Sequence, residues 1–77
     1  MVEAYVLIQT DVGKQPLVVS EVDQIQGVVT AQVVAGPFDV IARVAAEEVD
    51  SLAKLVVSKI QAVDGVTRTL TCPVVHL

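Results

Sequence analysis

The chain has 77 residues, enough for one small domain over residues 1–77, and its nine acidic and five basic side chains give a formal net charge of −4. Tyr5 and Phe38 are its only aromatic residues, so the sequence offers neither the basic patch nor the stacking rings of a nucleic-acid-binding surface. No apolar run reaches the roughly 20 residues that a membrane helix needs. The N-terminus also lacks a secretory signal pattern, so we expect a cytoplasmic protein.

The first half of the chain predicts a strand, a helix and a second strand. Residues Val2–Thr10 are rich in β-branched side chains, which favour a strand. Pro16 suits the first turn of a helix, and the apolar spacing continues that helix over Leu17–Gln24 until Gly27 ends it. Residues Val28–Ala35 form the second predicted strand. The buried stripe of the helix is predicted to contain Val18, Val22 and Ile25.

The second half predicts a strand, a longer helix and a final strand. Gly36 and Pro37 signal a turn, after which a third strand runs from Phe38 or Asp39 to Ala46 and forms an antiparallel hairpin with the second. Three acidic residues in the segment 47–50 favour a helix start, because the positive end of the helix dipole stabilises them, and Asp64-Gly65 ends this helix before a strand over Val66–Val74. Its buried stripe is predicted to contain Val49, Leu52, Ala53, Val56, Ile60 and Val63.

The predicted order is therefore β-α-β-β-α-β, the split βαβ or ferredoxin-like arrangement of the α+β class. It places two helices on one face of a four-stranded antiparallel sheet. An internal repeat supports this interpretation, because Leu17–Ser20 recurs as Leu55–Ser58 and Gly27 recurs as Gly65, each 38 positions later. Each half is then one β-α-β unit of equal length.

Self-association is the expected source of stability for so short a chain. Small domains usually depend on disulfides, metals or oligomerisation. Cys72 is the only cysteine and His76 the only histidine, so we expect no intrachain disulfide, no metal site and no cofactor. Hydrophobic residues make up 53% of the chain, and the first strand carries Tyr5 and Leu7 on the face opposite Val6. The uncovered side of the sheet would thus be apolar, which predicts a homo-oligomer rather than a monomer with a tolerated apolar surface.

Catalytic chemistry finds little support in the sequence. Nucleophilic catalysis would require Cys72 near a histidine, and we expect Cys72 instead to be a small buried thiol. Glu47 and Glu48 fit a solvated helix start better than an acid–base pair, and the glycines form no phosphate-binding fingerprint. We therefore predict that the protein is not an enzyme.

Two features could bind a ligand. The Gly36-Pro37-Phe38-Asp39 turn presents a ring and a carboxylate at one end of the sheet, where Asp39 could pair with an ammonium group. Alternatively it is a plain hairpin in which Asp39 accepts a hydrogen bond from its own turn. The threonine row at positions 67, 69 and 71 could supply hydroxyls to a polar ligand or be an ordinary strand face.

Several segments resemble the Lrp/AsnC effector-binding domain, also called RAM, of the leucine-responsive transcription regulators. The resemblance covers nearly the whole chain, and the order and spacing of the segments are more specific than any one of them. The segments are Ala4–Ile8, Gly13-Lys14, Ile25–Val28, Val34–Val40 and Val63–Thr71.

The resemblance implies dimers of the dimeric α/β barrel type, formed by sheet-to-sheet association, which can assemble into rings of dimers. It also implies small effectors, typically amino acids, in clefts between dimers. Asp39 and the turn backbone would bind an α-ammonium group, and the threonine hydroxyls a carboxylate or amide. Pro37 departs from the family by removing a backbone donor, and Phe38 stands where tyrosine is common. The ligand-binding residues implied are Gly36, Phe38, Asp39, Thr69 and Thr71.

Members of that family usually carry a helix-turn-helix domain before the effector domain, whereas here Met1 directly precedes the first strand. We therefore predict an effector-binding and oligomerisation module in transcription regulation without a DNA-binding domain of its own, able to mix with full-length relatives. One alternative is a structural homo-oligomer with a vestigial cleft. Another is a small enzyme of the dimeric α/β-barrel group, which would need a reactive acid or histidine in a deep pocket.

Overall fold

The structure is a computed structural model that describes all 77 residues. Its elements follow one another in the order β-α-β-β-α-β, and a π-helical turn extends the second helix. Their bounds are β1 Val2–Thr10, α1 Gln15–Asp23, β2 Val28–Val33, β3 Val40–Ala46, α2 Val49–Lys54, the π-helical turn η1 Leu55–Ile60 and β4 Val66–Pro73. The predicted ferredoxin-like α+β fold is confirmed, and neither helix is long and apolar enough to cross a membrane.

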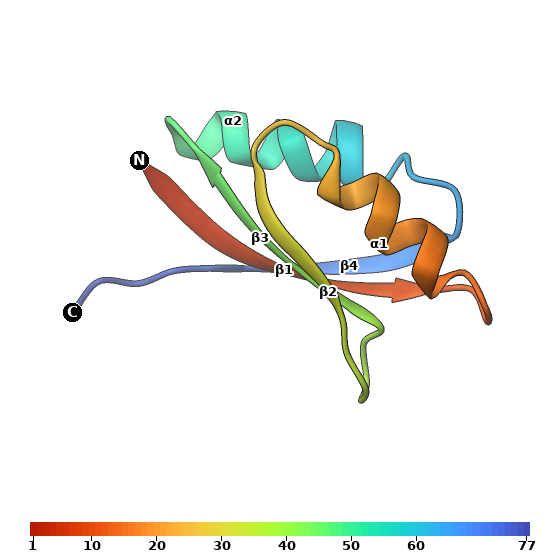
Figure 1. The fold of residues 1–77 in the computed structure, drawn as a ribbon. Coiled ribbons are helices and arrows are strands. Elements are labelled where there is room, and N and C mark those ends of the chain that lie inside the picture. Colours follow the sequence, from red (N-terminus) through yellow and green to blue (C-terminus); the bar gives the residue numbers. More distant parts are fainter.

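The four strands form one sheet in the order β2-β3-β1-β4, with every neighbouring pair antiparallel. β1 and β3 are central, while β2 and β4 are the edges. Both helices lie on the same side of this sheet (Figure 1). The sheet therefore has a helix-covered face and an open face.

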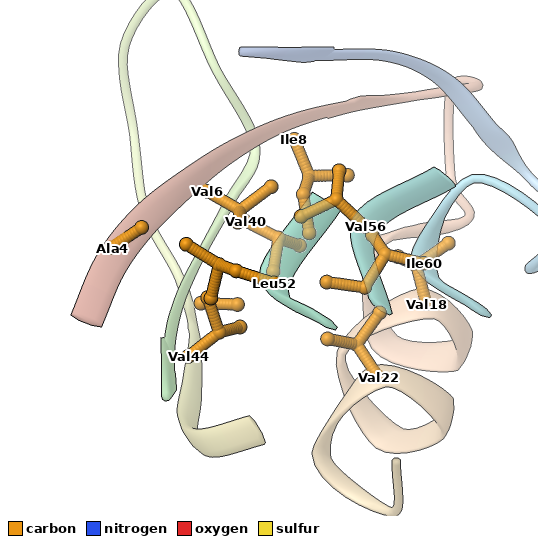
Figure 2. Close-up of a cluster of buried hydrophobic side chains, with 11 residues drawn as sticks. Ala4, Val6, Ile8, Val18, Val22, Val40, Val44, Leu52, Val56 and Ile60 are labelled. Carbon is orange, nitrogen blue, oxygen red and sulfur yellow. The ribbon is translucent and has the colours of Figure 1, made fainter. Parts of the chain in front are cut away.

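The hydrophobic core lies between the helix-covered face and the two helices. Residues directly opposite each other on neighbouring strands share a face, and Val6 of β1 lies opposite Ala42 of β3 in the middle of the core. Figure 2 shows side chains of these strands meeting those of both helices. The eleven buried core residues are Ala4, Val6, Ile8, Val18, Val22, Val40, Ala42, Val44, Leu52, Val56 and Ile60.

The second helix departs from the predicted stripe. Val49 and Ala53 were expected to be buried, but both are exposed, with Val49 66% accessible. They face the outer side of the helix, beside the edge strand β4, where no further element covers them. The prediction of a continuous α-helix was also wrong at its C-terminal half, where the Gln61 N–H donates to the Val56 carbonyl, a bond that spans five residues. The remaining predicted stripe is confirmed as buried or half-buried at Leu52, Val56, Ile60 and Val63.

The second strand is shorter than predicted and irregular. It ends at Val33 rather than Ala35, and β3 begins at Val40 rather than at the preceding residues. The register between β2 and β3 shifts between Val28 and Thr30, because a bulge places an extra residue in β2. Strict alternation therefore does not hold in β2, and Val28 shares the helix-covered face with Ala31.

The internal repeat corresponds to equivalent positions in the structure. Gly27 and Gly65 directly precede β2 and β4 and have φ values of 101° and 97°, a region of backbone conformation that favours glycine. The equivalent core positions, each 38 residues apart and all buried, are Ala4 with Ala42, Val18 with Val56 and Val22 with Ile60. The two β-α-β halves thus contribute to one core in the same way.

The open face carries large apolar side chains without cover from this chain. Tyr5 is 44% accessible and Leu70 is 45% accessible, and the half-buried Leu7 lies opposite Leu70 on one side and the half-buried Ile41 on the other. Cys72 lies opposite Tyr5 on this face and is exposed, so the predicted buried thiol was wrong. The reason is strand alternation, because the neighbours Thr71 and Pro73 take the helix-covered side.

Candidate ligand-binding site

The turn between β2 and β3 borders an apolar groove on the open face. The Val34 N–H donates to the Asp39 carbonyl at 2.9 Å and closes the turn, while Gly36 has a φ of 143° that a side chain would strain. Gly36 and Phe38 line the groove together with Leu7 and Ile41, which are opposite each other on β1 and β3. The hollow measures ≈ 520 Å³. It can hold an apolar side chain, but none of its lining side chains is charged.

Asp39 is fixed at the C-terminal end of β1. The Thr10 N–H donates to Asp39 Oδ2 at 2.9 Å, and the Asp39 N–H donates to the Ile8 carbonyl at 2.9 Å. The carboxylate thus accepts from a backbone donor of β1, whereas the plain-hairpin alternative placed its partner in the turn itself. One of its two oxygens is used in this way, and the protein supplies no partner to the other.

Phe38 contacts the first part of β4. The guanidinium carbon of Arg68 lies 6.0 Å from the centroid of the Phe38 ring, at the outer limit of a cation–π contact. The Gln9 side-chain amide donates to the Pro37 carbonyl at 3.3 Å and holds the turn against β1 from the same side. The turn therefore extends from β3 across the end of β1 toward β4, and the positive charge of Arg68 lies beside the Phe38 ring.

Thr69 and Thr71 lie on the other face of the sheet. They are opposite Ile8 and Val6, which are core residues, so their side chains point to the helix-covered side. There they line a hollow of ≈ 300 Å³ between the second helix and β4. The Gln61 side-chain amide donates to the Thr69 hydroxyl at 2.8 Å, which occupies one of the two predicted hydroxyls.

The five predicted residues do not converge on one hollow of a single chain. Gly36 and Phe38 line the open-face groove, while Thr69 and Thr71 line the hollow beside the helix. Asp39 connects the two areas, because its backbone binds Ile8, which is also opposite Thr69. The turn groove lies on the open face and the hollow beside the helix lies on the helix-covered side, so the sheet itself separates the two areas.

Two polar residues of this region were not predicted from the sequence as part of a binding site. Arg68 beside the ring and Gln61 beside Thr69 were not nominated. The register would have indicated Arg68, since it lies opposite Gln9, next to the end of β1. Gln61 gave no such signal, because the π-helical turn that directs it toward β4 has no sequence pattern of its own.

Ionisable groups in the structure form one ion pair, on the open face away from the turn. Arg43 Nη2 lies 2.6 Å from Glu3 Oε1, and this hydrogen bond, followed by charge attraction, raises the pKa of Arg43 above its usual value. A base with a raised pKa keeps its charge until the pH rises through that value, so the guanidinium of Arg43 is charged at neutral pH. No three or more His, Cys, Asp or Glu side chains come together in a way that could hold a metal ion.

The fold and the turn groove define the class of protein, a small α+β domain of the ferredoxin-like type with hollows on both sides of one sheet. The family model of the Lrp/AsnC ligand binding domain matches residues 3–76, and the chain belongs to this family. The resemblance inferred from the sequence is thereby confirmed. No sequence among the curated proteins matches the chain.

Solved structures agree with this assignment. The chain is similar to TTHA0845 of Thermus thermophilus, with 27% identity and a TM-score of 0.93 over 100% of this chain and 96% of that one. AsnC of E. coli shares the fold at 21% identity and a TM-score of 0.90, over 99% of this chain and 52% of that one. The transcriptional regulator NMB0573 of Neisseria meningitidis, solved with L-Met, shares it at 13% identity and a TM-score of 0.84, over 97% of this chain and 50% of that one.

Proposed function

We propose that this protein is an effector-binding and self-associating module of transcription regulation, whose effector is an amino acid. Membership of a ligand-binding family supports the general function. The observation that carries the amino-acid assignment is the Gly36–Asp39 turn, where an apolar groove, a carboxylate with one free oxygen and the Arg68 guanidinium lie at one sheet end. These groups would complement an apolar side chain, an α-ammonium group and an α-carboxylate respectively. The regulator NMB0573 was solved in complex with L-Met, which makes methionine a first ligand to test.

Self-association would complete the site. A second copy on the open face would cover Tyr5 and Leu70, form the dimer and border the turn groove, which lies on the same face. Thr69 and Thr71 lie outside that face, so a cleft that uses both the turn and the threonines would arise where two dimers meet. This arrangement explains why the proposed ligand-binding residues are divided between two hollows in one chain.

A thermal-shift screen against the standard amino acids tests the proposal. A ligand that binds only the native protein stabilises it by about 2.7 kcal/mol at a hundredfold excess over Kd, and each 1 kcal/mol raises the melting temperature of a domain of this size by about 4–8 °C. We expect one or a few amino acids to raise the melting temperature selectively. If none of them shifts it, the amino-acid proposal fails.

The variant that tests the role of Asp39 in ligand binding is Asp39→Asn rather than Asp39→Ala. Asparagine keeps an oxygen that can accept the Thr10 hydrogen bond, so it removes the charge while preserving the end of β1. We expect the ligand-induced shift to fall strongly in Asp39→Asn while the ligand-free melting temperature changes little. An unchanged ligand-induced shift would show that the effector binds elsewhere.

A second candidate function is a purely structural homo-oligomer. The bond from the Thr10 N–H to Asp39 favours it, because that bond gives the carboxylate a role without any ligand. The hydrogen bond from Gln61 to Thr69 likewise gives the Thr69 hydroxyl a structural role without any ligand. An oligomeric protein that gives no ligand-induced shift in the screen would support this candidate.

We also propose that mixed assembly with longer regulators of the family is the route by which this protein controls transcription. Co-purification with such a regulator tests that step. A protein that is always recovered without one would contradict it.

A further inference from the structure

The largest hollow of the protein lies at the end of the sheet opposite the Gly36–Asp39 turn. It measures ≈ 710 Å³ and is bordered by the start of β2, the end of β3 and one side of the second helix. Its lining residues include Gly27, Ala45 and Leu55, which give it an apolar floor. It shares no lining residue with the turn groove or with the hollow beside β4.

Positive charge gathers in this hollow although the protein is acidic. The chain has three lysines, and two of them, Lys54 and Lys59, line it together with the hydroxyls of Ser51 and Ser58. No aspartate or glutamate is part of the lining. The only ion pair in the structure joins two other residues, so neither lysine forms an ion pair with a carboxylate of this chain. Two ammonium groups and two hydroxyls are donors that suit an anion with several oxygens.

The π-helical turn contains the second lysine of the hollow. Ser51, Lys54 and Ser58 follow the spacing of one face of an α-helix. In a regular α-helix Lys59 would lie about 140° around the axis from Lys54, although close to Leu55, which is four positions earlier and also lines the hollow. A turn closed by bonds across five residues brings Lys59 back above Lys54. Turns of this type occur frequently at functional sites.

Small residues on the strand side keep the hollow open. A Cβ atom on Gly27 would lie 2.9 Å from Leu55 Cδ2 and 3.5 Å from the Ala45 carbonyl oxygen. Any side chain at position 27 would therefore reduce the space that the lysines face. The apolar floor under the charged rim suits a ligand that has a short carbon skeleton as well as its charge.

We propose that this hollow is a second ligand site, which binds a small dianion of the phosphate monoester class. Lys54 and Lys59 pair with the two charges, Ser51 and Ser58 donate to the remaining oxygens, and the carbon part lies on the apolar floor. A nucleic acid is a less suitable occupant, because two lysines provide few phosphate contacts and the net charge of −4 repels a polyanion.

Titration of the full chain followed by amide NMR signals tests the proposal. The probes are inorganic phosphate, glycerol phosphate as a monoester, and a single-stranded oligonucleotide. We expect saturable shifts at Gly27 and Ser58 with both small probes, with tighter binding of the monoester because of the apolar floor. Shifts that do not saturate, or tighter binding of the oligonucleotide than of the monoester, would overturn the proposal.

The chain offers a matched control in its third lysine. Lys14 lies directly before α1, next to Gly65, and does not line the hollow. All three lysines are exposed, so their replacement by glutamine leaves the core intact. We expect the K54Q/K59Q double variant to bind the monoester about tenfold more weakly or worse, since it loses two charged donors to the ligand. K14Q should match the unmodified protein, and an equal loss in K14Q would mean a non-specific charge effect and refute the site.

Discussion

The carboxylate of Asp39 has a structural role that can be separated from any role in ligand binding. The Thr10 N–H donates to Asp39 Oδ2 at 2.9 Å in a partly buried position. Hydrogen bonds to charged groups stabilise proteins by roughly 1.5–3 kcal/mol, and the partial exposure of this one places the expected cost of Asp39→Ala at about 1–2 kcal/mol. Asp39→Asn keeps an acceptor and should cost less than half as much. Urea denaturation of the two variants measures the difference, and equal losses would show that the charge, not the hydrogen bond, stabilises this end of β1.

The residues of the candidate site show what a sequence can predict about a binding surface. Composition and turn chemistry were enough to nominate Gly36, Phe38 and Asp39 as one turn, and the structure places them in one turn. Their division from Thr69 and Thr71 depended on which face of β4 points to the helices, and there the two threonines face the helix-covered side while Leu70 lies on the open face, the reverse of the usual polar-out pattern. That orientation is fixed by pairing with β1, a long-range property that no local pattern contains.

At the scale of elements, hydrophobic periodicity predicted the order and class of every helix and strand. Val18 and Val22 in α1, and Leu52 with Val56 in the second helix, are buried as the 3.6-residue spacing indicated. The π-helical turn and the bulge in β2 were not predicted, because each adds one residue to a regular repeat and depends on packing rather than on residue type. The π-helical turn contains Lys59, which lines the largest hollow.

The two β-α-β halves pack closely at Gly65, in the junction between the second helix and β4. Gly65 has a φ of 97°, and a Cβ atom there would lie 3.0 Å from Lys14 Cβ and 3.1 Å from Cγ2 of the fully buried Val18. Gly13 has a φ of 82° with nothing within 4 Å of its added Cβ, so Gly13→Ala measures the backbone strain alone, about 1–2 kcal/mol. We expect Gly65→Ala to lower the free energy of unfolding by about 1 kcal/mol or more beyond Gly13→Ala, because neither neighbour can easily move. Equal thermal stability of the two variants would mean that α1 shifts freely relative to this junction.

At the scale of the whole molecule, the core has two equivalent halves and uses one face of the sheet. Buried residues 38 positions apart, such as Val18 and Val56, cover that face from both helices. Nothing in the repeat provides a cover for the opposite face, where Tyr5 and Leu70 remain exposed. A chain of this size has few other means to gain stability, since Cys72 is its only cysteine and no metal cluster is present.

We therefore predict that two copies of the chain associate through their open faces as a two-fold homodimer. Leu70→Glu would place a charge in the proposed interface twice, once from each copy, and would remove two apolar side chains from it. We expect the dissociation constant to rise by about 100-fold or more, measured by sedimentation or light scattering over a concentration series. Val12→Glu is the control, because Val12 is fully exposed in the loop after β1 and outside the sheet. A Leu70→Glu variant that associates as strongly as Val12→Glu would show that the open face is not the interface, and the ligand cleft between dimers would lose its structural basis.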